Sequence, residues 1–135
     1  MLSLLERGKI NYLNAGKTTG SKLLEIGCGK GRFLEAAKER GFLVYGIEPS
    51  PRSFSFASAR LGSSVAPIAL EKLDSAPNFP SDYDYVMLWH VLEHLIDPGS
   101  VLTQIKGRLS AQGKVVFAAP NFASFQARWG LTCIT

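Results

Sequence analysis

Lys22-Leu-Leu-Glu-Ile-Gly-Cys-Gly-Lys-Gly-Arg-Phe-Leu34 is the stretch that decides the fold of this 135-residue chain. Its apolar start predicts a buried strand over residues 22–27, and its end begins a segment with helical spacing of apolar residues, over residues 31–40. Three glycines stand at alternate positions between them: Gly27, Gly29 and Gly31. A glycine turn of this kind brings backbone N–H groups and a helix N-terminus against a ligand. Because no packing benefit is evident for three such glycines, we interpret the segment as a cofactor-binding turn.

The spacing of the glycines argues against a dinucleotide cofactor. A dinucleotide turn has the pattern Gly-x-Gly-x-x-Gly, which would put its third glycine at position 32. That position is Arg32, and Glu25 precedes the first glycine by two residues, where its carboxylate would repel a pyrophosphate. A carboxylate there suits a ligand with a cationic amino group. A nicotinamide-dependent oxidoreductase is therefore the less favoured alternative.

A second acidic residue stands at the end of the next predicted strand, residues 42–48. In open α/β sheets, ligands bind outside the carboxyl ends of the strands, and an acidic residue about twenty positions after the glycines accepts from the ribose hydroxyls. Glu48 has that position and that chemistry, because a carboxylate can accept from both hydroxyls. We expect Glu48 to bind a ribose.

The rest of the chain alternates helical and strand patterns. Helices are predicted near residues 2–13, 51–61, 98–108 and 123–130, with a helical turn at 90–95. Strands are predicted at 64–68, 83–89 and 114–119, and a loop at 72–82. Strands that alternate with crossover helices predict a Rossmann-like, doubly wound, mostly parallel sheet in a single domain, residues 1–135.

Composition excludes several classes of protein. The chain is 46% hydrophobic, enough for one core, but no apolar run approaches the length of a membrane span. Its net charge of +4 is spread along the sequence, so we predict neither a nucleic-acid nor a membrane partner. The two cysteines give no disulfide framework, which favours the cytoplasm.

The cluster His90-Val-Leu-Glu93-His94 matches the zinc-peptidase pattern His-x-x-Glu-His. The pattern begins at the end of a predicted strand, however, and no glutamate follows Ile96 that could complete a ligand set. We therefore predict no metal site. The polar residues of this cluster have two open interpretations, a structural one at the first turn of a helix and a catalytic one.

The segment from Glu25 to Gly31 resembles motif I of the class I S-adenosylmethionine-dependent methyltransferases, Glu/Asp-x-Gly-x-Gly-x-Gly. Residues 83–95 look like the segment of the ubiquinone-biosynthesis-type small-molecule methyltransferases that ends in Val-Leu-Glu-His. Residues 109–121 resemble a further stretch of that group, with Ala111 and Gln112 in place of a Pro-Gly pair. The resemblance covers residues 23–128.

The resemblance implies S-adenosyl-L-methionine as the cofactor and a small-molecule oxygen, nitrogen or carbon nucleophile as the methyl acceptor. Glu25 would anchor the amino group of the methionyl part, Ala69 and Leu70 would form the adenine wall, and Trp89 would line the pocket. The implied cofactor-binding residues are Glu25, Gly27, Cys28, Gly29, Gly31, Glu48, Pro49, Ala69, Leu70 and Trp89. Methyl transfer by direct displacement needs mainly correct positioning, with His94 or His90 as the available base and Glu93 beside them.

The chain departs from the family pattern after its fifth predicted strand. The family has a seven-stranded sheet, whereas here we expect the strand order 3-2-1-4-5 with strands six and seven missing, as in a truncated enzyme. Residues 115–118 would then lie on an unpaired edge, which predicts a homodimer through strand five and weak methyl transfer. A non-catalytic S-adenosylmethionine-binding fragment or subunit is the main alternative.

Overall fold

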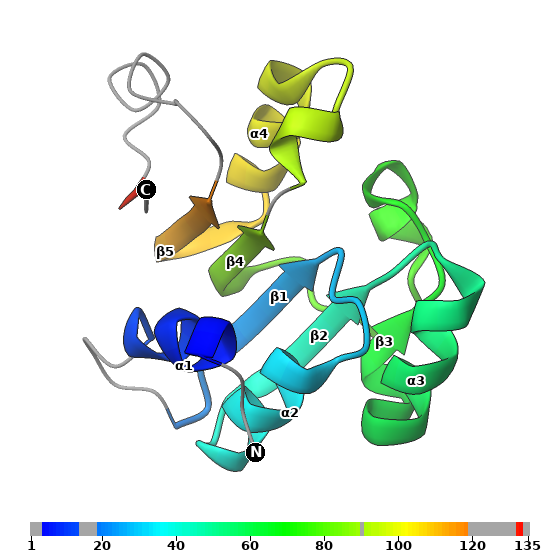
Figure 1. Ribbon diagram of the computed structural model, residues 1–135. Helices are drawn as coiled ribbons and strands as arrows, with labels where there is room; N and C mark the ends of the chain where they lie inside the picture. Colours follow the sequence, from blue (N-terminus) through cyan, green and yellow to red (C-terminus); the bar gives the residue numbers. More distant parts are fainter. Residues whose placement is uncertain (1–3, 14–18, 90, 119–131, 134–135) are drawn as a thin grey trace.

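The computed structural model describes residues 4–13, 19–89, 91–118 and 132–133 (Figure 1). Its helices and strands are α1 (Leu4–Asn11), β1 (Lys22–Ile26), α2 (Arg32–Glu39), β2 (Leu43–Ile47), α3 (Pro51–Leu61), β3 (Val65–Ala66), β4 (Tyr83–Trp89), α4 (Pro98–Lys106), β5 (Leu109–Ala118) and β6 (Thr132–Cys133). Short 3-10 turns are η1 (Gly62–Ser64), η2 (Leu70–Ser75) and η3 (Leu92–His94). The expected order of elements is confirmed up to β5, and the helix expected over residues 123–130 lies outside the described residues.

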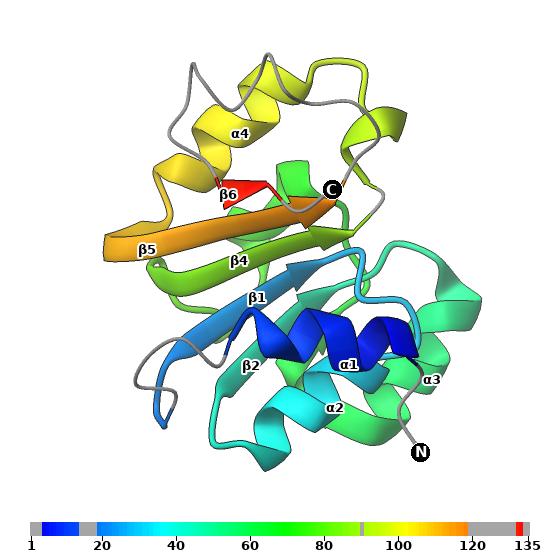
Figure 2. The same cartoon turned by 60° about the vertical axis from the view of Figure 1, so that its left-hand side comes forward.

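The strands form one sheet in the order β3-β2-β1-β4-β5-β6, and each neighbouring pair is parallel (Figures 1 and 2). The predicted order 3-2-1-4-5 and the Rossmann-like doubly wound class are therefore confirmed. The order reverses at β1, whose neighbours are β2 and β4. The carboxyl end of β1, where the glycine turn begins, is thus the switch point at which such sheets bind ligands.

A short sixth strand corrects the prediction about the sheet edge. β6 pairs in parallel with β5, with Val116 opposite Thr132 and Phe117 opposite Cys133. The expectation that strand five has an unpaired edge is wrong for these two residues, because the end of the chain returns beside them. The homodimer through that edge therefore stays a prediction that the structure does not support.

Side chains of the strands alternate between two cores, one on each face of the sheet. Leu23, Met87 and Val116 pack with α1, α2 and α3 on one face. Leu24 and Val86 point to the other face, where α4 and the η2 turn cover the sheet. Figure 2 shows α4 on one side of the strands and α1 and α2 on the other.

β5 begins earlier than the sequence indicated, at Leu109, which pairs with Tyr83. The register with β4 then shifts, so that Tyr85 pairs with Lys114. Gly113 lies at this irregularity, where a Cβ would come within 2.7 Å of the Tyr83 carbonyl oxygen. The glycine therefore permits a close approach of two backbones in the shifted region. The stretch expected as loop, residues 72–82, also overlaps the η2 turn.

Candidate cofactor site

The glycine turn follows β1 and is attached to the end of β2. The N–H groups of Gly27 and Cys28 both donate to the carbonyl oxygen of Ile47, at 2.9 and 3.1 Å. Gly27, Gly29 and Gly31 all have positive φ, at 70°, 56° and 76°. Side chains rarely adopt this left-handed region, so the turn needs glycine for its backbone path.

Glu48 fixes the turn with both carboxylate oxygens. Its Oε2 accepts from the N–H of Gly29 at 2.8 Å, and its Oε1 accepts from the N–H of Ser50 at 2.9 Å. Ser50 is the N-cap residue of α3, so one buried carboxylate joins the β1–α2 turn to the start of the next helix. Each oxygen keeps a further lone pair. Glu48 can therefore still accept hydrogen bonds from a ribose, as expected. It also has a structural role, holding the turn to α3, that the sequence did not indicate.

The three glycines of the turn have different neighbours. A Cβ at Gly31 would lie 3.0 Å from Leu61 Cδ1 and 3.2 Å from the Cα of Ala57, so Gly31 lets α3 pack against the turn. A Cβ at Gly29 would meet no protein atom within 4 Å. The assumption that the three glycines bring no packing benefit is thus wrong for Gly31, and Gly29 is the position that faces open space.

An apolar cavity of about 260 Å³ lies on one side of the turn. It is lined by Ile26, Gly27, Ile47, Glu48, Pro49, Ile68, Ala69, Leu70, Glu71, Val91, His94 and Leu95. Five residues predicted for the cofactor, namely Gly27, Glu48, Pro49, Ala69 and Leu70, come together here. The sequence reasoning missed the apolar walls Ile68, Val91 and Leu95, although each adjoins a motif that it had singled out.

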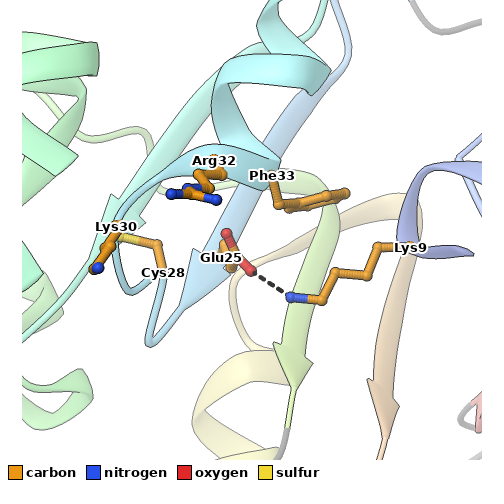
Figure 3. Close-up of a pocket in the computed structure, with 6 residues that line it drawn as sticks. All are labelled: Lys9, Glu25, Cys28, Lys30, Arg32 and Phe33. Atoms are coloured by element: carbon orange, nitrogen blue, oxygen red, sulfur yellow. Dashed lines mark hydrogen bonds and ion pairs between the residues drawn. The ribbon is translucent and has the colours of Figure 1, made fainter. Parts of the chain in front are cut away.

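A second cavity, of about 350 Å³, lies on the α1 and α2 side and has a charged lining (Figure 3). Glu25 is at its centre with a side chain only 3% exposed, and Lys9 of α1 reaches across to it, with Nζ 3.5 Å from Oε1. The two cavities lie on opposite faces of the sheet because successive side chains of β1 point to opposite faces. Glu25 therefore lines this cavity, and Ile26 lines the apolar one. The complete lining is Lys9, Glu25, Cys28, Lys30, Arg32 and Phe33.

Cys28 lines this ionic cavity, whereas Trp89 lies beside it and is not part of its lining. Burial, helped by the nearby charges of Glu25 and Glu48, raises the pKa of the Cys28 thiol to about 12, so the thiol stays protonated. Trp89, at the end of β4, has its ring 5.0 Å from Lys9 Nζ and 6.4 Å from the ring of Tyr12. Its buried Nε1 has no hydrogen-bond partner among the described atoms. The indole is thus placed beside the charged cavity, with a donor still available.

The predicted catalytic cluster is described only in part. His94 is exposed and lines the apolar cavity together with Glu48. His90 and the side chain of Glu93 lie outside the described residues, so their catalytic role stays a prediction. Within the described part of the chain, no group of three His, Cys, Asp or Glu side chains could hold a metal ion. The prediction that the cluster holds no metal stays untested, because two of its members are not described.

Two contributors to the site could not be found from the motifs. Lys9 comes from α1, outside every motif, and no local pattern signals its contact with Glu25. Gly46 in β2 lies under the turn, where a Cβ would come within 2.6 Å of Leu34 Cδ1 and 2.9 Å of Cys28 Sγ. A glycine inside a strand is the one signal for such a close approach.

Comparisons with known proteins agree with this fold. The methyltransferase domain family matches residues 5–133, and the chain therefore belongs to that family. A ubiquinone biosynthesis O-methyltransferase from Leptothrix cholodnii is 34% identical over 121 residues, covering 84% of this chain and 51% of the relative. The same-named protein of Pseudomonas savastanoi pv. phaseolicola is 33% identical over 105 residues, covering 76% and 45%. The chain spans about half the length of these curated relatives.

Solved structures show the same fold. A SAM-dependent methyltransferase from Archaeoglobus fulgidus superimposes with a TM-score of 0.66 at 26% identity, covering 83% of this chain and 50% of that one. In the described part of the protein, no helix is long and apolar enough to cross a bilayer.

Proposed function

We propose that this chain binds S-adenosyl-L-methionine across its glycine turn and transfers the methyl group to a small-molecule acceptor. The observation that carries the proposal is the arrangement of two unlike cavities on either side of one turn, with Glu48 holding that turn. One cavity is apolar and the other is ionic, which matches a ligand with a nucleoside at one end and an amino acid at the other.

The apolar cavity fits the adenosine part. Its walls around Ala69 and Leu70 offer the apolar contact that a purine ring needs, and Glu48 stands at the same cavity with lone pairs for the ribose hydroxyls. Gly29 leaves open space beside the turn, so the cofactor can approach the backbone closely. The fit supports Glu48, Pro49, Ala69 and Leu70 in the roles expected for them.

The ionic cavity fits the methionyl part, which carries an ammonium and a carboxylate. Glu25 offers a buried carboxylate to the ammonium, and Lys9 and Arg32 offer cations to the carboxylate. Trp89 lies next to this cavity, with its indole beside Lys9. Cys28 contributes a small, protonated side chain to the lining, since its raised pKa makes it unsuited to act as a nucleophile.

The cofactor, when bound, supplies an electrophilic methyl group, so the chain's residues need mainly to bind, orient and exclude water. Where the acceptor must lose a proton, His94 is the proposed base, with His90 and Glu93 as further candidates. The printed names of the relatives favour an oxygen acceptor over nitrogen or carbon. A cytoplasmic location remains part of the proposal, supported by a chain with two cysteines and no disulfide framework.

Calorimetric titration with S-adenosylmethionine, S-adenosylhomocysteine and NAD tests the proposal. We expect binding of the first two ligands and none of NAD. Binding of NAD alone would refute the assignment and restore the oxidoreductase alternative. A transfer assay with a labelled methyl group and a panel of phenols, amines and carbon acids then separates an enzyme from a non-catalytic binding chain.

A further inference from the structure

The side chain of Lys9 lies in the ionic cavity between Glu25 and two aromatic rings. Its Nζ lies 3.5 Å from Glu25 Oε1, 5.6 Å from the centre of the Phe33 ring and 5.0 Å from that of Trp89. The Lys9 side chain is only 21% exposed. A carboxylate and two aromatic faces thus hold a largely desolvated ammonium. Figure 3 shows this side chain extended from α1 toward Glu25.

The charges of the cavity are unbalanced. Three cationic side chains, the part-buried Lys9 and the exposed Lys30 and Arg32, line it together with the single carboxylate of Glu25. An added cation raises this imbalance, whereas a zwitterion leaves it unchanged. Because Lys9 and Glu25 are the charges that are shielded from water, a charge left without a partner beside them costs more than it would in water.

We propose that Lys9 makes this cavity selective for ligands that carry both an ammonium and a carboxylate, and that it excludes cationic ligands without the carboxylate. The inference rests on the proposed function. Without a ligand, the Lys9 ammonium pairs with Glu25, in the place that the ligand's ammonium would take. When a zwitterionic ligand binds, its ammonium pairs with Glu25 and its carboxylate pairs with Lys9. A ligand with only an ammonium displaces Lys9 and offers it no new partner.

Three ligands that share the thioadenosine part separate these cases. S-adenosylhomocysteine carries both charges, its decarboxylated analogue carries only the ammonium, and 5′-methylthioadenosine carries neither. Calorimetric affinities are compared for the wild type, for Lys9→Met, and for Lys22→Met as a control. Lys22 is also a lysine in a salt bridge, with Asp82 at 2.8 Å, but it lies at the start of β1 and outside both cavities.

We expect the wild type and Lys22→Met to prefer S-adenosylhomocysteine to the decarboxylated analogue by at least about tenfold. In Lys9→Met this preference should fall by about tenfold, because the analogue no longer displaces a cation. Lys9→Arg should retain the preference, and 5′-methylthioadenosine should bind all variants equally. A preference that survives unchanged in a folded Lys9→Met protein overturns the inference. If the wild type binds none of the three ligands, the proposed function itself fails.

A measurement on the Lys9-containing chain covers the case in which Lys9→Met does not fold. The chain has two tryptophans, so Trp129→Phe leaves Trp89 as the reporter beside Lys9. S-adenosylhomocysteine should change the emission of Trp89, because Lys9 leaves its position over the ring. 5′-Methylthioadenosine should bind without that change. Equal changes with both ligands contradict an exchange of partners by Lys9.

Discussion

Replacement of Glu48 by alanine should destabilise the fold as well as weaken cofactor binding. Glu48 is 9% exposed as a residue, and its carboxylate accepts from two backbone N–H groups, those of Gly29 and Ser50. A hydrogen bond to a charged group contributes about 1.5–3 kcal/mol. Ser50 is exposed, so water can replace part of its bond. We therefore expect Glu48→Ala to lower the free energy of unfolding by about 3 kcal/mol.

Urea unfolding followed by circular dichroism measures this loss, with Glu48→Gln and Glu35→Ala as comparisons. Glu48→Gln keeps one acceptor oxygen and should lose about half as much. Glu35 is 41% exposed in its ion pair with Arg60, so its removal should cost less than about 1 kcal/mol. If Glu48→Ala is no less stable than Glu35→Ala, the carboxylate does not hold the glycine turn and the reasoning is refuted.

Three further predictions follow from the close contacts and charges of the turn. Gly46→Ala puts a Cβ within 2.6 Å of Leu34 Cδ1, so thermal unfolding should show a free energy of unfolding lower by about 1–3 kcal/mol. Gly8→Ala is the control, because a Cβ there meets no atom within 4 Å, and it should leave the stability unchanged or raise it. Burial raises the pKa of the Cys28 thiol from 9.0 to about 12, so the unfolded chain loses this proton at a lower pH than the folded one. The free energy of unfolding should therefore fall as the pH rises from 9 toward 12, and Cys28→Ala should remove this part of the fall. An equal dependence of stability on pH in both proteins would contradict the raised pKa of Cys28. The Cβ of Gly29→Ala meets no protein atom, so this variant should lower the free energy of unfolding only by the strain of the positive φ, about 1–2 kcal/mol. It should nevertheless weaken the binding of S-adenosylhomocysteine by at least about tenfold in calorimetry. Unchanged affinity would show that the turn is not part of the site.

The features predictable from sequence are those set by local pattern. Short apolar runs predicted the strands, and their alternation with helical segments predicted a parallel sheet. The spacing from Gly27 to Glu48 predicted the switch point of that sheet. Pro49, Ala69 and Leu70 were expected from the resemblance to the methyltransferase family, and the structure places them beside Glu48 at the carboxyl ends of neighbouring parallel strands. Each of these inferences needed only the residues of one segment and a known topology.

The features that escaped prediction depend on contacts between distant segments. Lys9 reaches Glu25 from a helix that no motif includes, sixteen residues earlier in the chain. The packing of Gly31 against Ala57 becomes visible only once α3 is placed. The return of Thr132 to pair with Val116 likewise depends on how the end of the chain is folded, which the sequence pattern did not indicate.

Amide chemical shifts during titration with S-adenosylhomocysteine test the central claim most directly, because they report both cavities at once. If one ligand spans the glycine turn, the amides of Gly29, Ala69 and Lys9 should shift together and saturate at the same concentration. 5′-Methylthioadenosine should shift Gly29 and Ala69 but leave Lys9 nearly unmoved. Shifts confined to one cavity with S-adenosylhomocysteine, or none at saturating ligand, would contradict a single cofactor site across the turn.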